Sequence, residues 1–184
     1  MALRHKVFLS YYHDEDAKYR NEFETLFGNV MVSRSVNIGD IDPTTKTEYI
    51  MQTIRNDYLS DSTVTVVLIG AHTWQRKYVD WEIYSSLRDT SKSPRSGLIG
   101  ILLPTYQRPE PGKYSLNTIP PRLWDNVKDR EDGLVPFSQI YGWTEDQSFM
   151  QTIIDKAFER RNKINPINNR PMFAKNRSGE FWQD

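Results

Sequence analysis

Short runs of apolar, β-branched and aromatic residues alternate along the chain with longer segments in which apolar residues recur every three or four positions. The first pattern is typical of buried strands and the second of amphipathic helices. Their alternation predicts a parallel sheet with crossover helices on both faces. We therefore expect an α/β fold, a flavodoxin-like three-layer sandwich with a five-stranded parallel sheet.

The five strand runs are KVFLSYY, VMVSRSV, TVTVVLIG, GLIGILLP and GLVPF, which cover residues 6–12, 30–36, 63–70, 97–104 and 133–137. The third run is almost continuously apolar, and we expect it to be a central strand covered on both faces. Pro104 ends the fourth run because proline has no N–H for the sheet. The ligand site of such a fold lies at the carboxyl ends of the strands.

Four segments have helical spacing, the second of them beginning near Thr45 and the others covering residues 14–28, 79–89 and 144–162. Thr45 followed by Glu48 is a capping-box pattern for the second helix, and Thr144 can cap the last one. Residues 105–122 contain several prolines and are expected to form a long loop.

Composition excludes several classes of function. Basic and acidic side chains number 24 each, so no net charge attracts nucleic acid or an anionic membrane. Cysteine is absent, which excludes disulfides and thiol nucleophiles and fits a reducing compartment. No run approaches the roughly 18 apolar residues of a membrane span, and the N-terminal run is too short for a signal peptide. We therefore expect a soluble, cytoplasmic protein that binds neither nucleic acid nor membrane.

Few motifs of known chemistry are present. Neither G-x-x-x-x-G-K-[ST] nor G-x-G-x-x-G follows a strand, and G-x-S-x-G is absent, which argues against a P-loop, a dinucleotide site of the Rossmann type and a serine hydrolase. Residues 13–16 are acidic enough for Mg²⁺, as in receiver domains, but residues 69–71 lack the aspartate that such a site needs. The acidic side chains of residues 13–16 are also typical of the first turn of a helix, where they need no metal. His13 and His72 have no second histidine at ligand spacing, so we expect no metal.

Glu82 is the carboxylate that the helical pattern singles out. In VDWEIYSS, Val79, Ile83 and Leu87 form the core stripe, and Glu82 falls about 100° from the centre of that stripe. It would then lie in the first helical turn, at the rim of the carboxyl-end crevice, and reach a ligand without being buried. The positive helix end would keep it ionised, which suits stabilising a cation or orienting hydroxyls better than donating a proton.

An ionised carboxylate matches cleavage of a nicotinamide–ribose bond. That reaction passes through an oxocarbenium-like state, and its cationic leaving group needs no acid. The alternative interpretation is structural: glutamate is favoured in the first turn of a helix, and Trp81 packs under a loop. Spacing alone leaves both interpretations open.

Two stretches of the chain resemble the TIR domain family. VFLSYYHDED resembles the first box of TIR domains, and LIGAHTWQRKYVDWEI resembles the segment from their central strand to the helix that bears the catalytic glutamate. The pairing of FLSYYHD with VDWEI is similar to the TIR-like ThsB group of the bacterial Thoeris antiphage system. The resemblance covers residues 5–160.

The resemblance implies an NAD⁺ nucleosidase or ADP-ribosyl cyclase of the hydrolase class, with NAD⁺ as substrate and no cofactor. Such antiviral enzymes release nicotinamide and make a cyclic ADP-ribose type signal that activates a separate effector protein. Glu82 would be the catalytic glutamate. The substrate would be bound at the end of the first strand, in the loop after the second strand and beside Glu82, by Ser10, Tyr11, Tyr12, His13, Asn37, Gly39, Asp40 and Trp81. We expect one of the two tyrosines to stack on nicotinamide or adenine and strand alternation to bury the other.

Two departures from other TIR domains are visible. The loop NIGDIDPTT lacks the basic Pro-Gly pattern of receptor and adaptor TIR domains, which argues against a signalling scaffold. Trp81 directly before Glu82 fits the TIR-like subgroup. Self-association and a phage-derived trigger both fit as routes of activation. The alternative function is a non-catalytic flavodoxin-like module that binds a nucleotide or a protein.

The expected organisation is a TIR-like domain over residues 1–163 followed by a polar C-terminal extension over residues 164–184. The extension is rich in proline and asparagine, and it carries four apolar anchors, Met172, Phe173, Phe181 and Trp182. We expect it to be solvated or packed on the domain rather than to be a partner motif.

Overall fold

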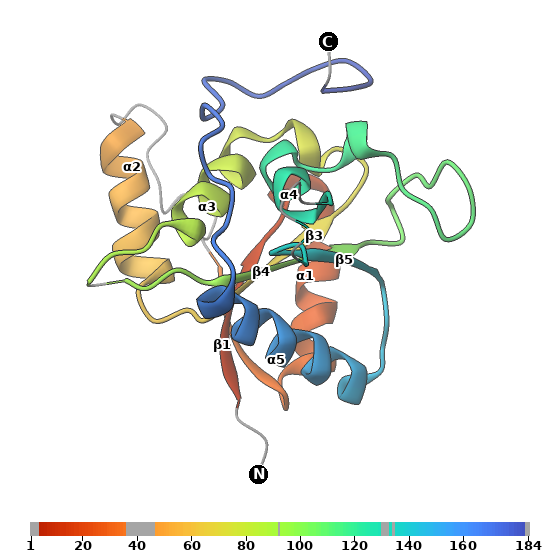
Figure 1. The fold of residues 1–184 in the computed structure, drawn as a ribbon. Helices are drawn as coiled ribbons and strands as arrows, with labels where there is room; N and C mark the ends of the chain where they lie inside the picture. Colours follow the sequence, from red (N-terminus) through yellow and green to blue (C-terminus); the bar gives the residue numbers. More distant parts are fainter. Residues whose placement is uncertain (1–3, 36–46, 92, 130–132, 134, 183–184) are drawn as a thin grey trace.

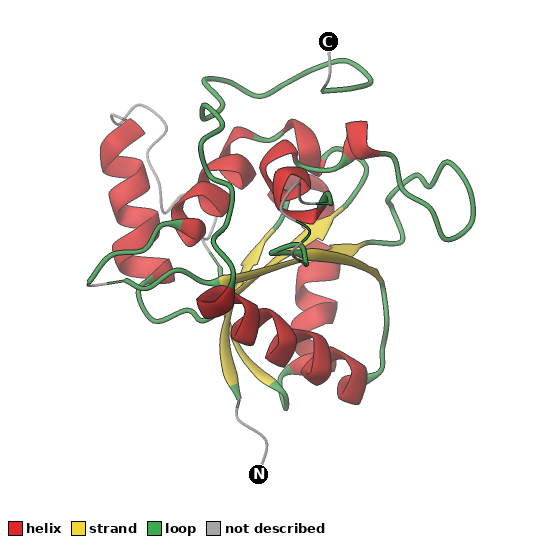
Figure 2. Ribbon diagram, in the orientation of Figure 1, coloured by secondary structure: helices red, strands yellow, loops and turns green. Residues whose placement is uncertain are grey.

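A five-stranded parallel sheet with helices on both faces forms the centre of the molecule, in a computed structural model that describes residues 4–35, 47–91, 93–129, 133 and 135–182 (Figures 1 and 2). The strand order is β2-β1-β3-β4-β5. The strands are β1 (His5–Ser10), β2 (Met31–Arg34), β3 (Val64–Ile69), β4 (Gly97–Leu102) and β5 (Gln139–Gly142). This architecture confirms the predicted flavodoxin-like sandwich.

Every residue of β3 and β4 is buried, as expected for parallel strands covered on both faces. β3 lies between β1 and β4, which confirms the third apolar run as a central strand. Gly97 at the start of β4 allows α5 (Gln147–Lys163) to approach the sheet, because a Cβ there would lie 2.2 Å from the Ala157 carbonyl oxygen.

Strand alternation divides the core between the two faces of the sheet. Val66 and Leu68 pack on the face covered by α1 (His13–Phe27) and α5. Val67 and Ile69 pack on the other face, against α3 (Lys77–Leu87) and α4 (Pro121–Val127). On that second face a further cluster joins β1 and α3 to α2 (Thr47–Thr53) and to a π-helix (Ile54–Leu59). Two short 3₁₀ turns, Thr73–Gln75 and Leu116–Thr118, complete the elements.

The position predicted for the last strand was wrong. The run over residues 133–137 contains Pro136, which cannot donate to a ladder, and the strand forms at Gln139–Gly142 instead. Phe137 enters the core from the preceding loop, where it is 1% exposed. The N–H of Ser138 then donates to the Asn126 carbonyl at 2.8 Å rather than to a strand.

Two further predictions need correction. The expected loop over residues 105–122 contains a 3₁₀ turn and the start of α4, since Pro121 occupies the first helical position, where its missing N–H is not needed. Asp146 rather than Thr144 caps α5, and its carboxylate accepts from the Phe149 N–H at 3.0 Å. The capping-box residue Thr45 lies outside the described residues.

Candidate functional site

Glu82 meets the end of the first strand at the carboxyl edge of the sheet. Ser10 is the last residue of β1, and its hydroxyl donates to the Glu82 carboxyl at 2.6 Å. Ser10 is fully buried and Glu82 is 4% exposed. The structure thus brings together two of the predicted site residues, which lie 72 positions apart in the sequence.

The expectation that Glu82 is accessible and ionised was wrong for the resting protein. Helix α3 begins at Lys77, two residues before the predicted start, so Glu82 is its sixth residue and lies in the second turn. The stabilising effect of a helix end falls off within the first turn. Burial therefore raises the pKa of Glu82 to about 8, and the Ser10 hydrogen bond offsets this only in part. At neutral pH the side chain is mostly protonated.

The two tyrosines after Ser10 lie in different surroundings. Tyr11 is buried in the core cluster of the α1 and α5 face, where its ring stacks on His13 at a centroid distance of 4.3 Å. Tyr12 is half-buried, and the Arg76 guanidinium lies over its ring at 4.0 Å. Arg76 directly precedes α3, so Tyr12 is the tyrosine held against the start of the Glu82 helix. Burial also lowers the pKa of His13, which keeps that imidazole neutral.

Asp16 is a buried carboxyl at the same sheet edge that the sequence did not distinguish from its acidic neighbours. Its oxygens accept from the hydroxyls of Thr73 at 3.2 Å and Thr105 at 3.4 Å, which joins α1 to the segments after β3 and β4. Burial raises its pKa to about 6. Gly70 permits this approach, since a Cβ there would lie 2.3 Å from the carboxylate. That contact is tertiary, and no local pattern could have indicated it.

The histidine that the sequence also singled out after the third strand adds no hydrogen bond or ion pair to Glu82 among the described residues. His72 is exposed and pairs with Glu15 at 2.8 Å. Among the described residues, no group of three or more histidine, aspartate or glutamate side chains is arranged to hold a metal ion. Asn37, Gly39 and Asp40 lie outside the described residues.

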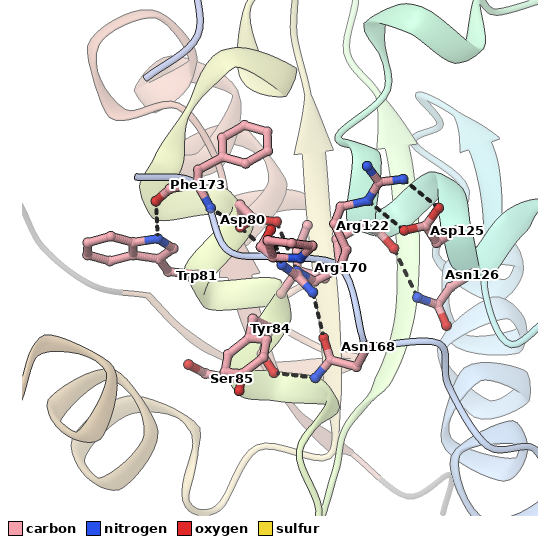
Figure 3. Close-up of polar contacts among 12 residues, drawn as sticks. Asp80, Trp81, Tyr84, Ser85, Arg122, Asp125, Asn126, Asn168, Arg170 and Phe173 are labelled. Atoms are coloured by element: carbon pink, nitrogen blue, oxygen red, sulfur yellow. Dashed lines mark hydrogen bonds and ion pairs between the residues drawn. The ribbon is translucent and has the colours of Figure 1, made fainter. Parts of the chain in front are cut away.

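Trp81, expected either to bind substrate or to pack under a loop, is part of the core and is covered by the C-terminal loop. It is 3% exposed and packs with Phe8 and Ile54 under α2 and the π-helix. Its indole N–H donates to the Phe173 carbonyl at 2.8 Å (Figure 3). The outer side of α3 is covered by a second layer, which includes the C-terminal segment. Its surroundings give Trp81 a packing role.

That segment, residues 164–182, is called here the C-terminal strap, and it runs across α3 and α4 (Figure 1). Arg170 of the strap pairs with Asp125 of α4 at 2.6 Å, and the strap also binds a buried ion pair between Asp80 of α3 and Arg122 of α4. In that buried pair Oδ1 lies 2.9 Å from Nε and Oδ2 lies 3.2 Å from Nη2. Asp80 is 2% exposed and Arg122 is fully buried. The Phe173 N–H donates to Asp80 at 3.0 Å, and Arg122 donates to the Asn168 side chain at 3.0 Å (Figure 3).

The strap also supplies the cap of the Glu82 helix. The side chain of Arg76, at the N-cap position of α3, makes no capping bond. The Lys77 N–H instead donates to the side-chain oxygen of Asn176 at 2.9 Å, and the Arg177 N–H donates to the Gln75 carbonyl at 2.8 Å. Residues almost 100 positions downstream therefore fix where α3 begins. Of the expected anchors, Phe173 is buried, and the Trp182 indole donates to the Leu116 carbonyl at 2.6 Å.

Comparison with protein families gives a match to the first half of the chain. The sequence model of a protein family described as the TIR-like domain of the Thoeris protein ThsB matches residues 8–108, which is more than half of the chain. The matched range contains Ser10 and Glu82 and ends before α4 and the strap. No curated protein gives a match to the chain. Among the described residues, no helix is long and apolar enough to cross a membrane.

A glutamine at position 82 should stabilise the fold relative to wild type by an amount that increases as the pH rises toward 8. The raised pKa of Glu82 contributes stability at low pH that is lost as the pH rises through about 8, whereas glutamine stays neutral. The gain in free energy of unfolding for Glu82→Gln should grow by roughly 1 kcal/mol per pH unit between pH 5 and pH 8. Urea unfolding across this range measures it. Glu159→Gln, which changes an exposed glutamate, is the control. A constant difference between Glu82→Gln and wild type at every pH would show that Glu82 ionises normally.

Loss of Arg122 should destabilise the protein because it leaves the Asp80 carboxylate buried without its partner. We expect Arg122→Met to lower the free energy of unfolding by about 3 kcal/mol or more. The matched control is Lys113→Met, which removes a cation from the exposed pair with Glu110 and should change stability by less than about 0.5 kcal/mol. Chemical unfolding measures both variants. Equal effects of the two substitutions would mean that the buried pair contributes no more to stability than an exposed one.

Proposed function

The chain belongs to the family of TIR-like domains of the Thoeris protein ThsB, and on that premise we propose that it is an NAD⁺-consuming enzyme of antiphage defence with Glu82 as its catalytic residue. The proposed reaction breaks the bond between nicotinamide and ribose and yields a cyclic ADP-ribose type signal for a separate effector. NAD⁺ is the substrate, and no cofactor is needed.

The observation that carries this proposal is a buried carboxyl without a cationic partner. Among the described residues no ion pair involves Glu82, and its carboxyl accepts a hydrogen bond from the Ser10 hydroxyl. Burying such a group opposes folding, and an apolar residue would pack here at no such penalty. A strongly shifted carboxyl at the carboxyl edge of a parallel sheet is typical of a functional site.

The positive charge of NAD⁺ would supply the cationic partner that Glu82 lacks in the resting protein. The nicotinamide ring of NAD⁺ is a pyridinium cation, and a cation within a few ångströms lowers the pKa of a carboxyl. Binding of NAD⁺ beside Glu82 would therefore drive the proton off the carboxyl and leave a carboxylate facing the ribose. The Ser10 hydroxyl, as the donor to Glu82, would keep this carboxylate in place.

The chemical step then needs no proton donor. The bond between ribose C1′ and the pyridinium nitrogen breaks, its electron pair stays on the nitrogen, and neutral nicotinamide leaves. Positive charge develops on C1′ and the ring oxygen, where the Glu82 carboxylate stabilises it. Attack on C1′ by water gives ADP-ribose, and attack by an adenine nitrogen of the same molecule gives a cyclic product. The attacking atom releases its proton, if it carries one, to solvent.

A binding module without turnover is the second candidate, and the burial of Glu82 favours it. The 4% exposed, mostly neutral carboxyl could serve as a structural hydrogen-bond acceptor for Ser10. A nucleotide or a protein would then bind at the same sheet edge without reaction.

Glu82→Gln should abolish nicotinamide release, by at least about a hundredfold, because an amide cannot offset developing positive charge. NAD⁺ and nicotinamide are measured in bacteria that express the protein during phage infection, which supplies the trigger. Glu159→Gln should behave like wild type. An unchanged NAD⁺ level in infected cells with wild-type protein would favour the binding module, and full activity of Glu82→Gln would remove Glu82 from the mechanism.

The pH dependence of turnover should reveal the charge coupling between Glu82 and substrate. The apparent second-order rate constant kcat/KM reports the free enzyme and should rise with pH up to about 8, because only the carboxylate is active. The value of kcat reports the complex and should level off at lower pH, since the pyridinium lowers the pKa. Steady-state kinetics with triggered protein measures both profiles. Identical profiles would contradict the coupling.

A further inference from the structure

A groove separate from the Glu82 site lies between the π-helix and the second half of α3. It encloses about 480 Å³, and the strap contributes Met172 to its wall. Tyr84 lines it from α3, and Arg88 lines it from the position directly after that helix. Tyr84 lies about 200° around the helix from Glu82, so the groove opens on the opposite side of α3.

Two arginines give the groove a positive lining. Arg55 comes from the π-helix and Arg88 from the C-cap position of α3, and the groove has no acidic lining residue. Among the ion pairs of the described residues none involves either arginine, while the nearby Asp89 pairs with Arg95 at 3.7 Å. Buried cations in proteins are normally paired with anions. The buried Arg55 therefore makes no ion pair within the described part of the chain, and the charge of Asp89 acts on it from beyond ion-pair distance.

The guanidinium group of Arg55 is held by hydrogen bonds from one nitrogen, while another nitrogen has no hydrogen-bond partner. Arg55 is 8% exposed, and its Nη2 donates to the Thr90 hydroxyl at 2.7 Å and to the Ser93 carbonyl at 3.0 Å. Its Nη1 is buried and has no hydrogen-bond partner. Burial and the neighbouring charge of Arg88 lower the pKa of Arg55, and the charge of Asp89 offsets them in part. An anion in the groove would relieve this repulsion and supply the missing charge.

The rest of the lining suits a ligand with both polar and apolar parts. Gln52 and Asn56 supply amide donors, and Met51 and Met172 supply flexible apolar surface. The π-helix that carries Arg55 and Asn56 is a rare backbone form that occurs frequently at functional sites. Met172 is 37% exposed, which leaves its side chain accessible to a ligand.

We propose that this groove is a binding site for a phosphate-bearing small molecule, distinct from the site at Glu82. The guanidinium groups of Arg88 and Arg55 bind the phosphate, because arginine donates to two phosphate oxygens at once. The apolar part of the ligand lies against Met51 and Met172. Since Met172 belongs to the strap, a bound ligand also joins the strap to α3 and stabilises the folded chain.

Calorimetric titration and thermal unfolding with inorganic pyrophosphate, and then with adenosine diphosphate, test the proposal. Both should bind wild-type protein and raise its Tm. Arg88→Ala should weaken binding at least about tenfold, and it should fold because Arg88 is exposed. Arg34→Ala, which removes an exposed arginine that does not line the groove, should bind like wild type.

Two further variants locate the ligand and its apolar part. If the nucleoside contacts the strap, Met172→Ala should weaken the binding of adenosine diphosphate more than the binding of pyrophosphate. If wild-type protein binds the two ligands equally, the site recognises the phosphate group alone. Binding lost in Glu82→Gln but kept in Arg88→Ala would place the ligand at the other site and overturn the proposal. Absence of binding to wild type, or an equal loss in Arg34→Ala and Arg88→Ala, would overturn it as well.

Discussion

The contact between Ser10 and Glu82 depends on α3 being held against the carboxyl end of the sheet, and the buried Asp80–Arg122 ion pair holds it there. The pair joins α3 to α4 and receives the strap through the Phe173 N–H. One helical turn thus carries three buried groups with different tasks: Asp80 fixes the helix, Trp81 fills the outer core and Glu82 faces the sheet edge. Removing one partner of such a pair leaves a charge without compensation, which is why the whole arrangement depends on it.

The packing of α3 against the sheet also explains why the Glu82 carboxyl is neutral. A carboxyl pressed against β1 loses its hydration, and a single hydroxyl donor does not replace that loss. The resting protein therefore keeps the group neutral, and in the proposed reaction the cationic substrate makes it ionise. A site of this kind would be inactive without NAD⁺ in place and would gain its catalytic charge only in the complex. Asp16, also buried at this sheet edge, is tied to Thr73 and Thr105 and serves instead to connect the loops around the site.

Most of the fold could be predicted from the sequence because it depends on local patterns. The fully buried strands β3 and β4 are near-continuous apolar runs, and α1 and α5 have clear helical spacing. The fifth strand was misplaced because its four residues are half-buried or exposed at a sheet edge and carry little apolar signal. Pro121 was read as part of a loop, although proline is equally suited to the first position of a helix.

The site was only partly predictable, since its chemistry depends on contacts between distant residues. Helical spacing and family resemblance identified Glu82, but its ionisation depends on Ser10 and on the layers that cover α3. Trp81 could not be placed, because its partner Phe173 lies 92 positions away. The groove at Arg55 and Arg88 depends on a π-helix, which has no signature in the hydrophobic pattern.

The most direct test of the role of Glu82 is the pKa of its carboxyl in the free protein and with NAD⁺ bound. Carbon-13 NMR of glutamate-labelled protein, with Glu82→Gln to assign the resonance, measures it without any need for turnover. We predict a titration near pH 8 in the free protein and a clear shift to lower pH with NAD⁺. A titration near the ordinary glutamate value of about 4.3, unchanged by NAD⁺, would contradict a buried carboxyl that the substrate ionises.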